Sequence, residues 1–522
     1  MQFENKIIYQ IYPKSFKDSN GDGYGDLAGI IEKLPYLKKL GVDYLWLSPI
    51  NKSPQNDNGY DISDYYEIDT IFGTKDEYLN LIKQAKKLGL KIMMDLVLNH
   101  ISTEHKWFKL ALQGQRQYQE YFIFREQPNE LQSAFGTNAW TYVPELKKYY
   151  LHLFDKTQAD LNWDNPQVKA EIYRMINYWL DLGIEGFRLD VIDLIGKEPD
   201  KLITAKGPKF LKNLQELTNN TFQDKVLTVG ECWNSSIQDA YQMTNHGLSQ
   251  VFHFFHINWI YPKWEAKKIT LTQIAQIINT WQNDYQGVEA LVQNNHDLPR
   301  YISYMFGQSM DYHYEKAILL LMINLMLKGN LYLYQGEEIG MSNNYQTTLV
   351  DYIDVETQNK IQELQQLGKN QTEILQLMQR ISRDNARSPM QWTSDEYAGF
   401  SEVKPWLLVN DNYKQVNVEQ DQKSVKSIYY TYQKLLKLRK QNYQLIKDSS
   451  YQCQVIEETG LIIKTEKFKV LLNFSNKPLT CKIEDVDVKI KNTKILFSNY
   501  QTKIFMNKLQ PYEGIILVTE GE

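Results

Sequence analysis

Short runs of apolar, β-branched and aromatic residues recur along most of the chain, and segments with helical periodicity separate them. The runs predict buried strands at IIYQIYP (7–13), VDYLWLSP (42–49), KIMMDLVLNH (91–100), GFRLDVI (186–192), VLTVGEC (226–232), VFHFFHI (251–257), EALVQNNHD (289–297) and LYLYQGEE (331–338). Amphipathic helices are predicted at 29–40, 78–89, 168–183 and 313–329. Strands alternating with helices in this number predict an α/β protein with a parallel (β/α)8 TIM barrel. The strands are apolar almost throughout, as expected where both faces of a sheet are buried.

Two segments depart from this alternation. Residues 101–164, between the third strand and the next helix, are rich in aromatic and polar residues and predict a small inserted domain. After about residue 445 the helical pattern stops, and KVLLNFSN, CKIEDVDVKI and EGIILVTE alternate like antiparallel strands. The predicted organisation is a barrel of residues 1–100 and 165–445, an inserted subdomain of residues 101–164 and a C-terminal antiparallel β-sandwich of residues 446–522.

Composition narrows the partners and the compartment. The formal net charge of −5 disfavours nucleic acid and anionic membranes, which need a basic face. The three cysteines, Cys232, Cys453 and Cys481, are widely spaced and odd in number, which suits a reducing compartment and offers neither a disulfide framework nor a zinc site. Since no secretory signal or membrane-length apolar run is present, we expect a cytoplasmic protein. We also expect it to be a monomer.

Charged residues inside the predicted strands point to chemistry. Arg188 and Asp190 lie two places apart in GFRLDVIDLIG, so a strand would turn both side chains to one face. A buried pair of this kind is either a structural ion pair or a reactive site. Polar residues at other strand ends favour the second reading, because barrel enzymes gather their chemistry at the C-terminal rim. Asp95 and His100 are predicted to close the third strand, Glu231 to end the fifth, and His296 and Asp297 to end the seventh.

Several other chemistries lack their sequence patterns. The chain has no Ser-His pair in an elbow motif, no phosphate-cradling glycine loop and no clustered Cys or His ligands. Carboxylate chemistry remains, and a carboxylate nucleophile paired with a carboxylic acid cleaves glycosidic bonds with retention. Such a pair must lie about 5–5.5 Å apart, with one group ionised and one protonated. We expect Glu231, followed by Cys232 and Trp233, to lie in the less polar surroundings that keep an acid protonated.

A series of motifs carries a family resemblance. The chain resembles the α-amylase superfamily of glycoside hydrolases (family 13), in its oligo-1,6-glucosidase and dextran glucosidase (glucan 1,6-α-glucosidase) branch. The matching blocks cover nearly the whole chain, in the order QIYPKSFKDSNGDGYGDL, DNGYDISDY, DLVLNH, QADLNW, GFRLDV, VGE, NNHD, YQGEEIGM and RDNARSPMQW.

The resemblance implies roles for the rim residues. Asp190 corresponds to the nucleophile, Glu231 to the acid/base and Asp297 to a third carboxylate that holds the sugar hydroxyls. Arg188 corresponds to the arginine that keeps the nucleophile ionised, because an adjacent cation lowers a carboxylate pKa. Further positions correspond to the sugar-binding residues: His100 and His296 as hydrogen-bond partners, Tyr60 as the stacking ring, and Phe154 and Gln158 as pocket wall.

The resemblance also bears on the mode of cleavage. Asp57 and Arg383 match a pair that closes the pocket behind the terminal glucose, which implies exo action. Alternatively, Arg383 forms an ion pair at the rim with Asp384. Arg387, one helical turn further on, is expected to be structural.

Two positions bear on the bond that is cleaved. Val191 matches a residue of α-1,6-cleaving relatives, although a valine in a buried strand is also ordinary core. Trp233 matches a tryptophan that stacks on the next sugar in dextran glucosidases, and the short segment GKEPDKLITAKGPKF agrees with that assignment. The resemblance therefore implies a glucan 1,6-α-glucosidase acting on isomaltooligosaccharides or dextran. Oligo-1,6-glucosidase, trehalose-6-phosphate hydrolase, transglycosylation or sucrose isomerisation, and a non-catalytic carbohydrate-binding scaffold are the alternatives.

A glycine-rich stretch, DSNGDGYGD, spaces oxygen ligands at alternate positions. They are Asp18, Asn20, Asp22, the Tyr24 carbonyl and Asp26, as in the first half of an EF-hand loop. The glutamate that completes an EF-hand is missing, but the family carries calcium here, so we expect a structural Ca²⁺. The alternative is a glycine-rich turn without metal.

Overall fold

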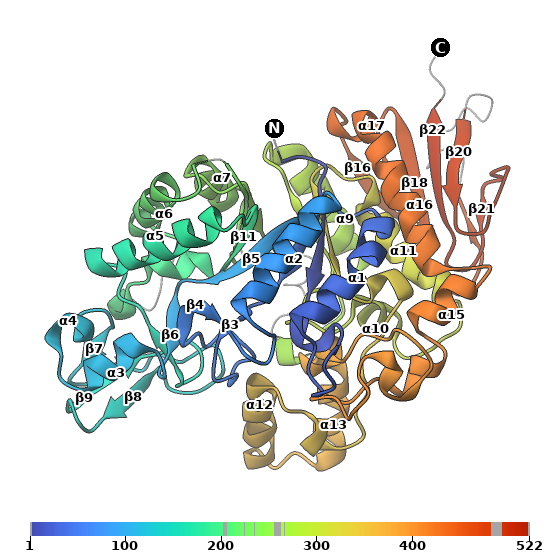
Figure 1. Cartoon of the computed structure of the whole chain (residues 1–522). Coiled ribbons are helices and arrows are strands. Elements are labelled where there is room, and N and C mark those ends of the chain that lie inside the picture. Colours follow the sequence, from blue (N-terminus) through green and yellow to red (C-terminus); the bar gives the residue numbers. More distant parts are fainter. Residues whose placement is uncertain are drawn as a thin grey trace.

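The computed structural model describes residues 3–201, 206–223, 225–233, 235–254, 263–265, 267–481 and 493–519. Its centre is a parallel sheet of eight strands in the order β13-β12-β11-β5-β2-β1-β15-β14. Two neighbours in this sheet, β5 and β11, are labelled in Figure 1. The two end strands contact each other, and the Gln250 side-chain amide donates to the carbonyls of Val288 and Glu289 at 3.2 Å. These contacts close the sheet into the predicted barrel.

The predicted barrel strands are all present, and each is shorter than its apolar run. They are β1 (Ile7–Ile11), β2 (Tyr44–Leu47), β5 (Lys91–Val97), β11 (Gly186–Asp190), β12 (Leu227–Glu231), β13 (Gln250–Phe252), β14 (Ala290–Val292) and β15 (Asn330–Tyr334). His100 was expected to close the third strand, but it begins β6 (His100–Ser102), which pairs antiparallel with β10 (Gln158–Asp160). His296 and Asp297 likewise lie in the loop after β14 rather than in the strand. Residues 255–257 of the sixth predicted strand are outside the described part.

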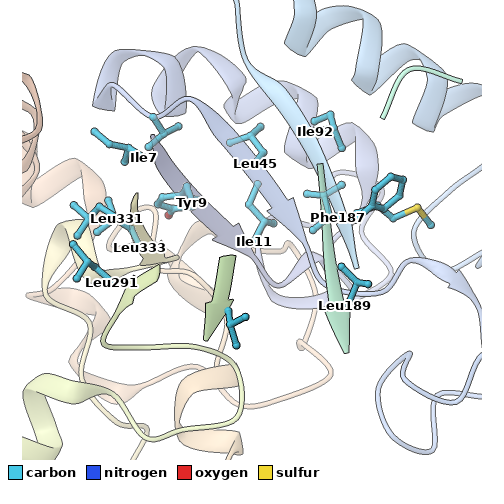
Figure 2. Packing of buried hydrophobic residues seen from close by; sticks show 14 of the residues in the cluster. Ile7, Tyr9, Ile11, Leu45, Ile92, Phe187, Leu189, Leu291, Leu331 and Leu333 are labelled. Atoms are coloured by element: carbon cyan, nitrogen blue, oxygen red, sulfur yellow. The ribbon is translucent and has the colours of Figure 1, made fainter. Parts of the chain in front are cut away.

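Alternation along the strands divides the core into two layers. Ile7, Tyr9 and Ile11 of β1 and Phe187 and Leu189 of β11 pack outward in the larger hydrophobic cluster (Figure 2). A second cluster holds the side chains of the opposite face, such as Ile8, Trp46, Met93, Val229 and Tyr332. Because successive side chains point to opposite faces, Arg188, Asp190 and Glu231 share the inner face with this second cluster.

Helices cover the outside of the barrel. The four predicted helices are α1 (Leu27–Leu40), α2 (Lys75–Lys87), α5 (Pro166–Asp181) and α11 (His313–Leu325); α6 (Pro208–Asn220), α7 (Ile237–Asn245), α9 (Leu271–Asp284), α10 (Tyr301–Phe306) and α16 (Ile428–Gln441) add to them. Local signals set the helix starts: Asn165 caps α5 and Pro166 occupies its first turn, while Thr74 and Glu77 form a capping box on α2. In α5 the buried residues Val168, Ile172, Met175 and Trp179 form one stripe toward the sheet.

Two excursions from the barrel flank its C-terminal rim. The first contains α3 (Lys106–Leu112), α4 (Arg116–Gln119), β7 (Phe124–Arg125), β8 (Trp140–Val143) and β9 (Lys148–Leu151), and it projects to one side in Figure 1. The second is a helical hairpin of α12 (Val355–Gln366) and α13 (Gln371–Ile381), which the sequence patterns did not predict.

The C-terminal part is antiparallel, as predicted. A five-stranded sheet has the order β16 (Gln452–Ile456), β17 (Gly460–Lys464), β18 (Phe468–Asn473), β22 (Gly514–Thr519), β20 (Thr493–Ser498). A small sheet of β19 (Leu479–Thr480) and β21 (Lys508–Leu509) packs against it through Leu479, Phe505 and Leu509. The strand expected at 481–490 lies outside the described residues apart from Cys481. Among described helices, none has the length and hydropathy needed to cross a membrane.

Candidate active site

A cavity of about 440 Å³ lies where β11 and β12 end in Asp190 and Glu231. The predicted sugar-site residues line it, except Gln158 and Arg188, which lie behind the wall. The lining residues are Asp57, Tyr60, His100, Ala134, Phe135, Phe154, Asp190, Val191, Asp193, Leu194, Glu231, Trp233, His296, Asp297, Glu356 and Arg383. This volume is within the range of small-ligand pockets, roughly 300–1,000 Å³.

One guanidinium organises the floor of the cavity. Arg188 donates from Nη1 to Asp190 Oδ1 at 2.7 Å and to Asp95 Oδ1 at 2.8 Å, and from Nη2 to Glu231 Oε2 at 2.6 Å. The Arg188 side chain is 2% exposed and each carboxylate is buried. We call Arg188, Asp95, Asp190 and Glu231 the Arg188 cluster.

Charge in the Arg188 cluster is unbalanced, because three carboxyl groups share one cation. Burial raises the pKa of Asp190 well above its usual range, and it raises the pKa of Glu231 and of Asp95; Arg188 opposes the shift in each case. The neighbouring carboxylates add to the rise for Asp190. The predicted effect of Arg188 on Asp190 is therefore present but outweighed. Since burying three anions beside one cation is unfavourable, the cluster retains a proton near neutrality.

Glu231 does not lie in apolar surroundings, contrary to expectation. Its Oε2 accepts from Arg188 and from the Val191 main-chain N–H at 3.1 Å, and its Oε1 accepts from the Trp233 indole Nε1 at 3.1 Å. Burial is the largest influence on the pKa of Glu231 and raises it. Arg188 opposes this rise, and Asp297 adds to it. Its protonation thus depends on exclusion of water rather than on apolar neighbours.

The backbone turns sharply after Asp190. Val191 has φ 35° and ψ 47°, a left-handed conformation that is strained for a β-branched residue. In this conformation the Val191 N–H points to Glu231, and the chain continues into a 3-10 turn over Ile192–Gly196. Val191 is therefore not only a core residue, because its main-chain N–H contacts Glu231, the candidate acid/base.

A second ion cluster contributes Asp57, Asp297, Glu356 and Arg383 to the cavity lining. Arg383 contacts Asp354 at 2.6 Å, Asp57 at 3.1 Å, Asp297 at 3.3 Å and Glu356 at 3.4 Å. Arg387 contacts Asp297 at 3.0 Å and Asp354 at 3.2 Å. We call these six residues the Arg383–Arg387 cluster. The Asp57–Arg383 contact agrees with the prediction, whereas the alternative pair with Asp384 does not form, since Asp384 accepts from the N–H groups of Ile353 and Asp354.

Two guanidinium groups give this cluster a different charge state. Burial alone would raise the pKa of Asp297, but the His296 ring and both arginines hold it well below its usual range. Asp354, which also contacts both arginines, likewise has a lowered pKa despite its burial. Asp57 forms an ion pair with one of the two arginines, Arg383, and burial raises its pKa to about 7. Arg387 is fully buried and fixes Asp297, so its expected structural role includes orientation of a cavity residue.

Neutral hydrogen-bonding side chains connect the two clusters. Tyr60 donates to Asp95 at 3.1 Å, and its hydroxyl lies 2.6 Å from His296 Nε2. Gln158 donates to Asp57 at 3.1 Å and lies 3.2 Å from His100 Nε2, so it supports the wall from behind. Burial lowers the pKa of His100 to about 4 and of His296 to about 3, which leaves both rings neutral near pH 7.

Sequence reasoning missed several residues of the wall. Asp354 is the N-cap of α12 and Glu356 lies in its first turn, so both arrive with the unpredicted hairpin. Phe135 comes from the inserted segment and lies over the Arg383 guanidinium, with its centroid 5.2 Å from Cζ. Asp193 lines the cavity three residues after Asp190, and burial raises its pKa to about 7. Of these residues, only Asp193 lies close to a motif that the sequence analysis used, GFRLDV.

The predicted metal loop folds around its own amides. Asp18 accepts from Gly21 N at 2.7 Å and Gly23 N at 2.9 Å, and Asp26 caps α1 by accepting from Gly29 N at 2.6 Å. The path requires positive φ at Gly21 and Gly23. Asn20 and Asp22 are exposed and Tyr24 is half-buried. Within the described residues, no group of three or more His, Cys, Asp or Glu side chains is placed to hold a metal ion. Since the loop offers only oxygen donors, calcium is the metal its chemistry suits, and the site stays a prediction.

A parallel barrel with two buried carboxyl groups that share a guanidinium at the floor of a sugar-sized cavity has the arrangement of a glycoside hydrolase. Comparison with known sequences agrees: the α-amylase catalytic domain profile matches residues 10–448. The chain belongs to the α-amylase family.

Individual relatives cover nearly the same length. A glucan 1,6-α-glucosidase of Streptococcus pneumoniae is 42% identical over 98% of each chain. A trehalose-6-phosphate hydrolase of Escherichia coli is 42% identical over 84% of each chain. Among solved structures, the trehalose-6-phosphate hydrolase of Bacillus licheniformis superposes with a TM-score of 0.90 at 38% identity, over 99% of each chain.

Proposed function

We propose that the chain is a retaining, exo-acting glucan 1,6-α-glucosidase. It hydrolyses α-1,6-glucosidic bonds from the non-reducing ends of isomaltooligosaccharides and dextran through a covalent glucosyl-enzyme. The observation that carries this reaction class is the sharing of Arg188 by Asp190 and Glu231, which brings two carboxyl groups of adjacent strands to one small gap. A gap of this kind suits a nucleophile and an acid on opposite sides of one bond.

In the first half of the reaction an Asp190 oxygen attacks the anomeric carbon. Glu231 gives its proton to the glycosidic oxygen as the bond from that oxygen to the anomeric carbon breaks. In the second half Glu231, now ionised, takes a proton from water, and the resulting hydroxide displaces Asp190. Asp297, kept ionised by Arg383 and Arg387, accepts hydrogen bonds from the sugar hydroxyls.

Exo action follows from the Arg383–Arg387 cluster. We infer that the ion pair of Asp57 and Arg383, with Phe135 lying over the guanidinium, closes the cavity beyond the sugar that reacts. A glucan chain can therefore enter only by its non-reducing end. Val191 and Trp233 also line the cavity, where we expect the departing part of the chain to contact them.

Charge on the cavity wall favours a neutral substrate. The described lining residues include six carboxyl groups, Asp57, Asp190, Asp193, Glu231, Asp297 and Glu356, and one arginine, Arg383. A phosphorylated disaccharide would bring further negative charge to this wall. This observation supports the glucosidase over the trehalose-6-phosphate hydrolase, the second candidate, which similarity to the Escherichia coli enzyme favours.

Comparing kcat/KM on isomaltotriose and trehalose 6-phosphate tests the assignment. We expect isomaltotriose to be preferred by at least about 100-fold, with glucose as the first product. A preference for trehalose 6-phosphate would exclude the proposal. Release of glucose from dextran ends would separate it from an oligo-1,6-glucosidase limited to short substrates, and hydrolysis of either sugar would exclude a non-catalytic scaffold.

Calcium in the loop of residues 18–26 is part of the proposal and has a structural role, because the loop contributes no residue to the cavity. Treatment with a chelator should remove about one calcium per chain and lower the melting temperature by a few degrees, without changing KM. If metal content and melting temperature both stay unchanged, the loop is a glycine-rich turn that binds no calcium.

A further inference from the structure

Trp233 is held in one orientation beside Glu231. The Trp233 ring lies on the cavity wall and packs on Phe254 with a centroid distance of 4.7 Å and an interplanar angle of 32°. Lys206 Nζ also donates to the main-chain carbonyl of Trp233 at 2.7 Å. The indole Nε1–H then points to Glu231 Oε1, at 3.1 Å. A ring that served only as a stacking surface would not need its N–H directed to a carboxyl group.

The two oxygens of Glu231 have different surroundings. Oε2 accepts from Arg188 Nη2 and from the Val191 N–H, so two donors already occupy it. Among the described residues, the indole is the donor at Oε1. A proton on Oε2 would face two donors, whereas a proton on Oε1 can turn to the open cavity. The proton of the acid form therefore belongs on Oε1, the oxygen that the indole contacts.

We propose that Trp233 is a positioning residue for the acid/base, acting through its indole N–H on Glu231 Oε1. This inference rests on the proposed role of Glu231. While Glu231 is protonated, the N–H occupies one lone pair of Oε1 and leaves the proton directed at the glycosidic oxygen. After the proton has moved to the leaving oxygen, the same N–H donates to the carboxylate and stabilises it until water gives up its proton.

The substitution Trp233→Phe separates the N–H from the ring face. Phenylalanine keeps an aromatic surface for a sugar but cannot donate a hydrogen bond. Because a donor lowers the pKa of a carboxyl group, its loss should raise that pKa. The alkaline limb of kcat/KM on isomaltotriose should move up by about one pH unit. We expect kcat to fall about tenfold, while KM changes by less than about threefold. An unchanged alkaline limb, with only a higher KM, would reduce Trp233 to a stacking surface and overturn the inference.

Trp140→Phe is the matched control. The Trp140 indole donates to Asn129, which does not titrate, and it does not line the cavity. Its variant should retain the pH profile of the wild type. The melting temperatures of both variants check that each is folded.

A second measurement does not depend on turnover. In the wild type with ¹⁵N-labelled tryptophan, the indole resonance absent from Trp233→Phe should shift with pH, and Glu231→Gln should abolish that shift. A resonance that stays constant with pH would overturn the inference. If the wild type hydrolyses no glucoside, the proposed function fails, but the titration of this resonance still decides whether the indole reports on Glu231.

Discussion

Two arginine-centred clusters meet in one cavity, and they hold their carboxyl groups in opposite states. In the Arg188 cluster three carboxyl groups share one guanidinium, and burial raises the pKa of each. In the Arg383–Arg387 cluster Asp297 and Asp354 each contact two guanidinium groups, and their pKa values fall despite burial.

The number of cations that a buried carboxyl group contacts therefore decides which state it favours. A shortage of cations leaves a proton available for transfer, while a second cation fixes a permanent anion that can accept hydrogen bonds. Asp57, with one arginine and a pKa raised to about 7, follows the same rule inside the second cluster. Within one cavity, the balance of charges therefore suits the Arg188 cluster to proton transfer and the Arg383–Arg387 cluster to sugar binding.

The largest expected effect is on the chemistry of the Arg188 cluster. Asp190→Asn should lower kcat on isomaltotriose by a factor on the order of 10⁴ or more, because an amide cannot act as the nucleophile. Circular dichroism should remain that of the wild type. Activity within tenfold of the wild type would show that the nucleophile lies elsewhere.

The next effect concerns stability of the Arg383–Arg387 cluster. Arg387→Met should lower the free energy of unfolding by about 3–5 kcal/mol, because it leaves Asp297 and Asp354 buried with one guanidinium between them. Arg174→Met is the control, since Arg174 is 65% exposed and pairs with Glu171 at the surface. Its free energy of unfolding should stay close to that of the wild type, because an exposed ion pair contributes little. Equal effects of the two substitutions in denaturant titrations would contradict the importance of the second cation.

Stability against pH should distinguish the clusters by sign. The folded pKa of Asp190 is raised, so its stability contribution is present below the unfolded pKa of about 3.9 and is lost as pH rises. Asp190→Asn should therefore melt above the wild type at pH 7, and the gap should close below about pH 4.

Asp297 has a lowered folded pKa, so its contribution is present above about pH 3.9 and is lost as pH falls. Asp297→Asn should be destabilised by about 2 kcal/mol at pH 7, with a gap that narrows in acid. Melting curves of the two variants at pH 4 and pH 7 that moved in the same direction would contradict the comparison.

The sequence predicted the barrel well because its signals are local. Apolar runs marked all eight strands, and helical periodicity marked α2 and α5, although the caps at Thr74 and Asn165 start these helices earlier than predicted. It also placed Arg188 and Asp190 on one face, since alternation in a strand needs no knowledge of the fold. The strand ends were predicted too long at His100 and Asp297, where polar residues continue an apolar run but leave the sheet.

The Arg383–Arg387 cluster was predicted only in part. Asp57 and Arg383 came from the family resemblance, but a hairpin that no motif marked brings Asp354 to the two arginines and Glu356 to the cavity. The role of Arg387 was underestimated for a similar reason, because nothing in RDNARSPMQW indicates that Arg387 contacts Asp297 as well as Arg383 does. Long-range pairing of this kind depends on how loops from separate strands converge.

By itself the sequence determined the order of the elements, the inward direction of Arg188, Asp190 and Glu231, and the kind of chemistry they allow. Only the tertiary structure decided how many cations each carboxyl group contacts and how far water is excluded from it. The reason is that periodicity along a chain fixes the direction of a side chain, whereas its pKa depends on every charge that folding brings within a few ångströms.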